Sequence, residues 1–311
     1  MRLNRRRNLL LLCVLASVAL TGLAAPAPSA AAIVGIGDQK PETFTAPLFR
    51  DLRVKRTRYI TPWNSITAEP ERLDAWITAA RAAGAQPLIA FEKARSQRCP
   101  SRSCRPPSVR QFTSAFRKFR RKYPTIRLIQ PWNEVNSPTQ PTGRNPRRAA
   151  EFYNVVRRYC RGCTVPAADI QDLSVRTMTR YLATFRRYAR GNPRLWGLHN
   201  YSDTNRNGTE RTRAMLRLVP GRIWLTETGG QYQFRGGRSP LAPSESRQAR
   251  ATTHMFRIAN SRAFRRRIQR VYIYQWSANN ADDVFDAGLV NPNGTPRRAY
   301  AVVKANQRYI R

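Results

Sequence analysis

Residues 86–131 contain one complete strand–helix–strand unit: QPLIAF at 86–91, VRQFTSAFRKFRRKY at 109–123 and IRLIQP at 126–131. The two outer runs are short and apolar, which is typical of buried strands. Between them, Phe112, Phe116 and Phe119 recur at the 3.6-residue period of an amphipathic helix. This order predicts a βαβ unit with parallel strands.

The same unit recurs along the chain. The starts of the β-rich runs advance by about 34 residues on average, the length of one strand plus one helix. We predict eight strands, at 33–37, 54–60, 86–91, 126–131, 163–168, 195–200, 222–226 and 270–275. We predict helices at 71–83, 109–123, 149–159, 178–189, 244–258 and 297–307.

The number of strands decides between two α/β architectures, a closed barrel and an open doubly wound sheet. Eight strands favour the barrel. The first run ends in Gly35-Ile36-Gly37-Asp38 and leads into no G-x-G-x-x-G motif, which argues against a dinucleotide-binding sheet. We therefore expect an α/β fold of a single domain, a (β/α)8 TIM barrel.

The first 32 residues have the pattern of an export signal peptide. Arg2, Arg5, Arg6 and Arg7 precede an apolar run at 9–20 that is too short to span a bilayer, and small residues end at 30–32. No later apolar run is long enough for a membrane span. These features predict that residues 33–311 form the mature domain, secreted or extracellular and in part cell-wall associated.

Four of the five cysteines lie outside this signal, in two close pairs. Cys99 pairs with Cys104, and Cys160 with Cys163, as local disulfides suited to an oxidising compartment. A zinc site built from both pairs is the alternative, but C-x4-C spacing fits zinc poorly. The sequence predicts no metal site and no cofactor.

Basic residues dominate the composition. The chain has 56 Lys and Arg against 18 Asp and Glu, a formal net charge of +38. Such a surface attracts polyanions, including anionic cell-wall polymers. The arginines are dispersed over the helices rather than gathered in one stripe with interleaved aromatic residues, so we expect no specific nucleic-acid partner.

Polar side chains follow the predicted strands where a barrel places its reactive groups, at the C-terminal strand ends. The fourth strand leads into Asn133-Glu134, and the seventh into Thr226-Glu227. Strands four and seven stand across the ring from each other. Two carboxyl groups about 5–5.5 Å apart there suit glycosidic cleavage by double displacement. We interpret Glu134 as the acid/base and Glu227 as the nucleophile.

At these strand ends the chain resembles the clan A retaining glycoside hydrolases, the cellulase-like and β-xylosidase-like TIM barrels with catalytic glutamates after strands 4 and 7. The matching residues are Asn133-Glu134, His199-Asn200-Tyr201, Glu227 and Trp276. The resemblance implies that Asn133 binds the sugar 2-hydroxyl and that Tyr201 hydrogen-bonds the nucleophile. It further implies that the ring of Trp276 forms the floor of the sugar-binding site. It also implies that Arg58, on the second strand, keeps the nucleophile ionised.

Three further residues are candidates for substrate binding. His199 is one of two histidines and is expected to hydrogen-bond in the sugar site rather than to bind a metal. Trp63 and Trp132 follow strand ends, where each either stacks on a sugar or packs within a loop. Asn133-Glu134 is followed by Val135 where many clan members have proline, and the third strand ends in Glu92-Lys93 where several have histidine. These departures leave the substrate open.

The sequence thus predicts a secreted, monomeric O-glycosyl hydrolase that cleaves β-glycosidic bonds of a polysaccharide or oligosaccharide with retention, either as a β-glycosidase or as an endo-glycanase. Transglycosylation would use the same residues. The alternative is a non-catalytic carbohydrate- or cell-wall-binding barrel with a polyanion-binding basic surface; the presence of both glutamates argues against it.

Overall fold

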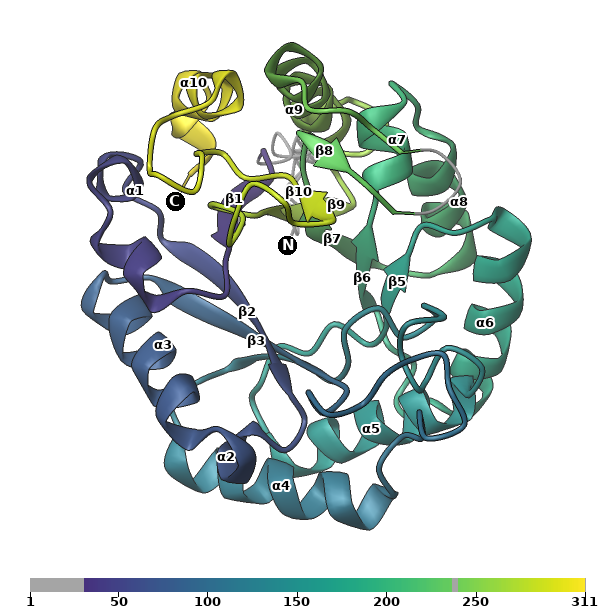
Figure 1. The fold of residues 1–311 in the computed structure, drawn as a ribbon. Coiled ribbons are helices and arrows are strands. Elements are labelled where there is room, and N and C mark those ends of the chain that lie inside the picture. The colour runs from purple at the N-terminus through teal and green to yellow at the C-terminus, as the bar shows by residue number, and fades with distance from the viewer. Residues whose placement is uncertain (1–30, 237–239, 311) are drawn as a thin grey trace, which may run out of the picture.

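A computed structural model describes residues 31–236 and 240–310. Its main sheet has eight parallel strands in the order β4-β3-β2-β1-β9-β7-β6-β5, which curve into a nearly closed barrel surrounded by helices (Figure 1). The strands are β1 (Ile33–Gly37), β2 (Arg56–Pro62), β3 (Gln86–Glu92), β4 (Leu128–Gln130), β5 (Asp169–Gln171), β6 (Leu195–His199), β7 (Arg222–Thr228) and β9 (Ile268–Tyr274). The predicted (β/α)8 barrel is confirmed.

The barrel closes between β4 and the segment that precedes β5. Thr164 forms an isolated parallel bridge with Leu128, accepts a 3.2 Å hydrogen bond from the Ile129 amide and donates one of 2.8 Å to Arg127 O. The prediction of a fifth strand at 163–168 is therefore wrong in place. Within 163–168 only Thr164 forms a bridge. The strand itself begins at Asp169.

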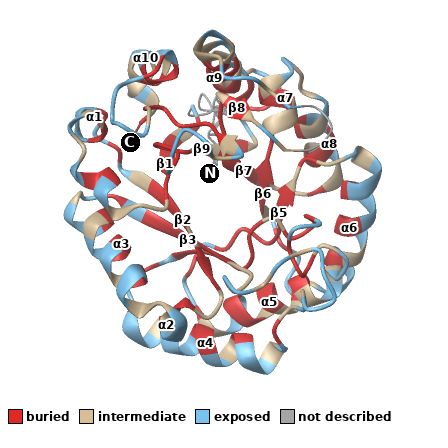
Figure 2. Ribbon diagram, viewed as in Figure 1, coloured by how far each residue is buried: buried red, intermediate tan, exposed pale blue. Residues whose placement is uncertain are grey.

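Helices cover the outside of the barrel, and their apolar stripes face inward (Figure 2). In α4 (Val109–Lys122), Phe112, Phe116 and Phe119 are buried and meet Phe91 of β3 edge-on. The other helices are α1 (Pro47–Asp51), α2 (Ser65–Ala68), α3 (Pro70–Ala82), α5 (Pro146–Tyr159), α6 (Val175–Tyr188), α7 (Tyr201–Asn205), α8 (Glu210–Leu218), α9 (Glu245–Asn260) and α10 (Arg298–Ala305), with two 3-10 turns, η1 (Pro41–Thr45) and η2 (Gln307–Tyr309).

Inside the barrel, an apolar layer gives way to a polar one. Four buried side chains from different strands pack together nearer the N-terminal strand ends: Leu88, Leu128, Trp224 and Tyr272. Because side chains alternate along a strand, the residue two positions further on faces the same interior. These next positions include Gln130, Thr226 and Tyr274, so polar groups collect toward the C-terminal strand ends.

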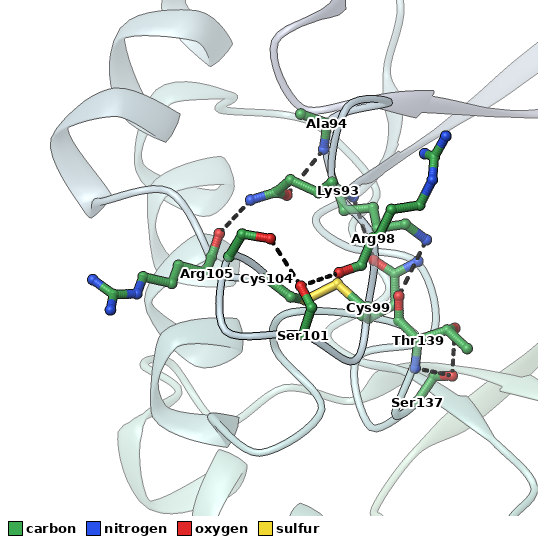
Figure 3. Close-up of a disulfide and its surroundings, with 12 residues drawn as sticks. Lys93, Ala94, Arg98, Cys99, Ser101, Cys104, Arg105, Ser137 and Thr139 are labelled. Atoms are coloured by element: carbon green, nitrogen blue, oxygen red, sulfur yellow. Dashed lines mark hydrogen bonds between the residues drawn. A yellow bond between two sulfur atoms is a disulfide. The ribbon is translucent and has the colours of Figure 1, made fainter.

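Loops at that end carry further structure. A small two-stranded antiparallel sheet, β8 (Gln233–Phe234) with β10 (Phe285–Asp286), lies beside the ends of β7 and β9 (Figure 1). In the β3–α4 loop, a disulfide joins Cys99 to Cys104, and Lys93 Nζ donates a 3.1 Å hydrogen bond to Thr139 O of the β4–α5 loop (Figure 3).

The second disulfide joins Cys160 to Cys163 between α5 and β5. Both cysteine pairs are thus bonded as predicted, rather than shared in one zinc site. Nearly all of the predicted export signal, residues 1–30 of 1–32, lies outside the described residues. Within the described ranges, no helix combines the length and the apolar character needed to cross a membrane.

Candidate active site

The two candidate catalytic glutamates converge on one histidine. Nδ1 of His199, at the end of β6, lies 3.1 Å from Oε1 of Glu134 and 3.9 Å from Oε2 of Glu227. These two carboxyl oxygens are therefore at most about 7 Å apart, the sum of 3.1 and 3.9 Å. The side chains are 18% and 10% exposed. Such a separation is within reach of the roughly 5–5.5 Å of retaining enzymes.

Arg58 of β2 is the central cation of the cluster. Its buried guanidinium donates from Nη1 to Glu227 Oε2 (2.8 Å) and from Nη2 to Asn133 Oδ1 (2.6 Å) and Asp169 Oδ2 (3.1 Å). Nε donates to Gln130 Oε1 at 3.1 Å. The rigid fork of arginine suits this bridging of several acceptors. Arg58 therefore fixes the positions of Asn133 and Glu227 relative to each other.

His199 is held between two acids. Its Nε2 lies 2.8 Å from Oδ2 of Asp169, and both side chains are fully buried. Burial alone would lower the pKa of His199, but the charges of Asp169 and Glu227 outweigh it and raise that pKa to about 10. Burial opposes ionisation of Asp169, yet the charge of His199 brings its pKa below the ordinary value. An imidazolium donates from both ring nitrogens, here toward Glu134 and Asp169.

Tyr201, the first residue of α7, donates its hydroxyl to Glu227 Oε1 at 3.1 Å. Burial and the neighbouring Glu227 carboxylate raise the pKa of Tyr201 well above its usual range. The hydroxyl therefore keeps its proton and remains a donor. Glu227 thus receives one hydrogen bond on each oxygen, from Arg58 and from Tyr201.

The backbone of Glu134 adopts φ 44°, in the left-handed region that residues other than glycine rarely occupy. Its amide lies 3.5 Å from Asp169 Oδ2, and the next amide, of Val135, donates to Asp169 O at 2.9 Å. Strained backbone of this kind persists only when neighbouring contacts impose it. The contacts to Asp169 hold the turn that presents Glu134 to His199.

The three predicted tryptophans lie apart from these contacts. Trp132 is fully buried and stacks on Phe152, which agrees with the packing role among its two predicted alternatives. Trp276 is 4% exposed and meets Phe49 and Tyr300 edge-on, so little of its ring is open to a sugar; its role as a sugar floor stays a prediction. Both rings belong to the buried hydrophobic core. Trp63 is partly buried against the hydrophobic core.

Sequence reasoning missed Asp169, because the fifth strand was placed six residues too early. Asp169 is fully buried and contacts Arg58 and His199, and it accepts a hydrogen bond from the Thr226 hydroxyl. Its position at the first residue of β5 was the signal that a correct strand boundary would have exposed. Gln130 and Tyr274 were missed as well. Burial and the nearby Glu227 raise the pKa of Tyr274 well above its ordinary value.

Asp38 and Glu92, the acids at the ends of β1 and β3, have surroundings that differ from each other. Asp38, after β1, is buried and accepts hydrogen bonds from the amides of Trp276 and Ser277 at 3.0 and 3.2 Å, so it anchors the loop after β9. Glu92, at the end of β3, accepts from Gln140 Nε2 at 3.3 Å. Burial raises the pKa of Glu92, and the charge of Glu134 adds to the effect.

No protein-family model and no curated protein matches the sequence. Solved structures do match the fold. A family 39 glycoside hydrolase from Bacteroides cellulosilyticus WH2 is 14% identical with a TM-score of 0.60, over 89% of this chain and 64% of that chain, so this chain spans less than two thirds of its length.

A fungal β-1,4-galactanase structure is 12% identical with a TM-score of 0.62, covering 88% of this chain and 99% of that chain. The catalytic domain of a Streptomyces mannanase is 13% identical with a TM-score of 0.56, over 89% and 85%. All three are glycosidases on this barrel. The chain therefore has the (β/α)8 fold of the clan A glycoside hydrolases.

Proposed function

We propose that the protein is an O-glycosyl hydrolase that cleaves β-glycosidic bonds with retention of configuration, with Glu227 as nucleophile and Glu134 as acid/base. The observation that carries the proposal is the convergence of both carboxyl groups on His199 Nδ1, at 3.1 and 3.9 Å. Two carboxyl groups so close at the C-terminal strand ends suit a double displacement at one sugar carbon.

In the first step Glu227 attacks the anomeric carbon and the leaving oxygen takes the proton of Glu134. The donors Arg58 and Tyr201 stabilise the ionised Glu227 and aim its oxygens. In the second step Glu134 removes a proton from water, which attacks the glycosyl-enzyme. The covalent bond has then cancelled the charge of Glu227, so Glu134 ionises without a second carboxylate beside it.

The other strand-end groups position these two. Arg58 fixes Asn133 for contact with the sugar 2-hydroxyl, an interaction that strengthens in the oxocarbenium-like transition state. His199, charged and locked by Asp169, contacts Glu134 and sets its orientation. The substrate in this proposal is a β-linked polysaccharide or oligosaccharide. Two intramolecular disulfides support the further proposal that the chain is exported after loss of residues 1–32.

The test is azide rescue with aryl β-glycosides, comparing wild type, Glu227→Ala, Glu134→Ala and Glu151→Ala. Glu151 lies on α5, outside the cluster, and serves as the control. In Glu227→Ala, azide takes the place of the missing nucleophile, so a single displacement gives a glycosyl azide of inverted configuration. In Glu134→Ala, azide attacks the glycosyl-enzyme, so two displacements give the retained product.

Proton NMR of the anomeric centre identifies each product. Two results together would support both assignments. Wild type and Glu151→Ala turn over the glycoside, and azide gives the inverted product with Glu227→Ala and the retained product with Glu134→Ala. Inverted product from wild type itself would contradict double displacement. If wild type binds β-glucans or other β-linked polymers but cleaves none, the alternative of a non-catalytic binding barrel replaces the proposal.

A further inference from the structure

Helix α9 presents a basic stripe beside α7, made of residues that the glycosidase proposal does not use. Arg247, Arg250, His254 and Arg257 follow one another at intervals of three or four residues, which places them on one face of the helix. Together with Thr204, Asn205, Asn207, Ala251 and Thr253, they line a cavity of about 550 Å³. Helices α7 and α9 lie side by side around this part of the rim (Figure 1).

The lining of this cavity has cationic groups and no carboxylate. Arg250 and Arg257 are exposed, and neither has an ion pair or hydrogen bond among residues 31–236 and 240–310. Asp203 of α7 does not line the cavity, and its carboxylate accepts hydrogen bonds from the backbone amides of Arg211 (3.1 Å) and Thr212 (2.6 Å). The residues that line the cavity therefore carry a net positive charge.

Arg247 supplies a second and independent observation. Its Nη2 donates to Tyr232 O (2.8 Å) and Ala242 O (2.6 Å), which fixes the guanidinium in place. Its Nε, by contrast, is buried with no hydrogen-bond partner in the described part of the chain. A buried donor left unpaired is costly, so such a group points to a missing acceptor.

An arginine-rich surface alone would not single out this place, because the whole chain carries a net charge of +38. Other cavities are also lined by cations: one of about 570 Å³ beside α5 has Arg157, Arg158 and Arg190 together with Glu151, and one of about 480 Å³ has Arg157, Arg194 and Arg222 without a carboxylate. Among these cavities the α9 pocket differs because one of its lining arginines, Arg247, is fixed by hydrogen bonds and keeps a buried donor without a partner.

We propose that the α9 pocket binds a tetrahedral oxyanion, phosphate or sulfate, as a substituent of a larger molecule. Arginine forks donate in pairs to such groups, so Arg247 and Arg250, about one turn apart on α9, can share the oxygens of one such group, while Arg257, about two turns beyond Arg250, can contact its carrier. The volume exceeds the need of one ion and leaves room for its carrier. The site is separate from the glycosidase proposal and does not depend on it.

The experiment uses calorimetric titration of the full chain with inorganic phosphate, inorganic sulfate and dextran sulfate at fixed ionic strength. Arg250→Ala/Arg257→Ala is compared with Arg110→Ala/Arg121→Ala, which removes the same charge from exposed positions on α4, across the barrel from α9 (Figure 1). We expect the α9 double variant to lose about tenfold or more in affinity, while the α4 variant stays within about twofold of wild type.

The three probes separate the sources of the oxyanion. If phosphate or sulfate binds at one saturable site and only the α9 double variant loses this binding, a small anion is sufficient. If the α9 double variant loses affinity for dextran sulfate alone, the pocket recognises an oxyanion carried by a polymer. Both results support the pocket. Equal losses in the two double variants would show that only net charge matters and would overturn it. Arg250→Lys/Arg257→Lys keeps the charge but not the fork, and unchanged affinity there would also contradict the proposed recognition.

Discussion

Nε2 of His199 lies 2.8 Å from Oδ2 of Asp169, and neither side chain is exposed to solvent. This buried pair joins β5 to β6 below the catalytic glutamates. It keeps His199 protonated at neutral pH, with a pKa of about 10. The orientation of Glu134 therefore depends on a residue, Asp169, that does not itself contact Glu134's carboxyl group in the structure.

Replacement of Asp169 by asparagine removes that charge with little change of shape. We expect the pKa of His199 to fall and kcat/KM to fall roughly 10- to 100-fold, because a neutral imidazole no longer donates from both nitrogens. NMR titration of the ring nitrogens can follow this directly, since the chain has only two histidines and His254→Gln assigns the other. An unchanged His199 titration would show that Asp169 does not set its charge.

The same pair predicts how stability depends on pH. The folded pKa of His199, about 10, is above its unfolded value of 6.5, so the folded protein holds more protons between these values. The contribution of His199 to the free energy of unfolding is then complete below pH 6.5 and is lost as pH rises toward 10. Urea unfolding at several pH values should show this loss in wild type and a smaller one in Asp169→Asn. Parallel pH profiles would contradict the coupling.

Replacement of Arg58 by alanine leaves Glu227 and Asp169 without their shared buried cation. We expect the free energy of unfolding to fall by about 3–5 kcal/mol. Arg58→Lys should recover only part of it, because one ammonium cannot reach all the acceptors of the fork. Arg95→Ala is the control: its ion pair with Glu69 is exposed, and its loss should cost about 0–1 kcal/mol. Equal losses in Arg58→Ala and Arg95→Ala would refute a central role for Arg58.

Tyr201→Phe deletes the 3.1 Å hydrogen bond to Glu227. We expect kcat/KM to fall about 10- to 100-fold, since a hydrogen bond to a charged group contributes about 1.5–3 kcal/mol. Tyr181→Phe is a matched control, because that buried hydroxyl also makes a 3.1 Å hydrogen bond, to Thr142 O away from the cluster. Aryl glycoside kinetics should show the loss in Tyr201→Phe only. Similar activity of both variants would remove Tyr201 from the mechanism.

The two disulfides close short loops, with sequence separations of 5 and 3 residues. In the chain-entropy model each should stabilise the fold by about 2 kcal/mol. Unfolding of Cys99→Ser/Cys104→Ser and Cys160→Ser/Cys163→Ser in urea measures both, and reduction of wild type should give the sum. Stability that responds to a zinc chelator and not to a reductant would instead favour the zinc alternative.

The strand and helix pattern was predictable because burial repeats with the period of each element. Helix α8 was not predicted, and the fifth strand was predicted in the wrong place. Its neighbourhood, Cys163 to Ala168, is apolar enough to read as a strand, yet only Thr164 pairs there as a bridge. Backbone pairing with β4 and β6 decides where β5 begins, and those partners are distant in sequence. That displacement concealed Asp169, the residue that completes the site.

The amino-acid sequence by itself determined the alternation of strands and helices that predicts the barrel, because burial repeats with the period of each element. It also placed the cysteines in two close pairs, put Glu134, Glu227, His199 and Tyr201 at predicted strand ends, and put Arg58 on a predicted strand; the resemblance to clan A glycoside hydrolases implied that these residues share one site. Tertiary structure alone decided that Arg58 bridges Glu227, Asn133 and Asp169, and that Trp132 and Trp276 turn into the packed core. The physical reason is that hydrogen-bond geometry and exclusion of water arise only when strands remote in the chain are brought within a few ångströms.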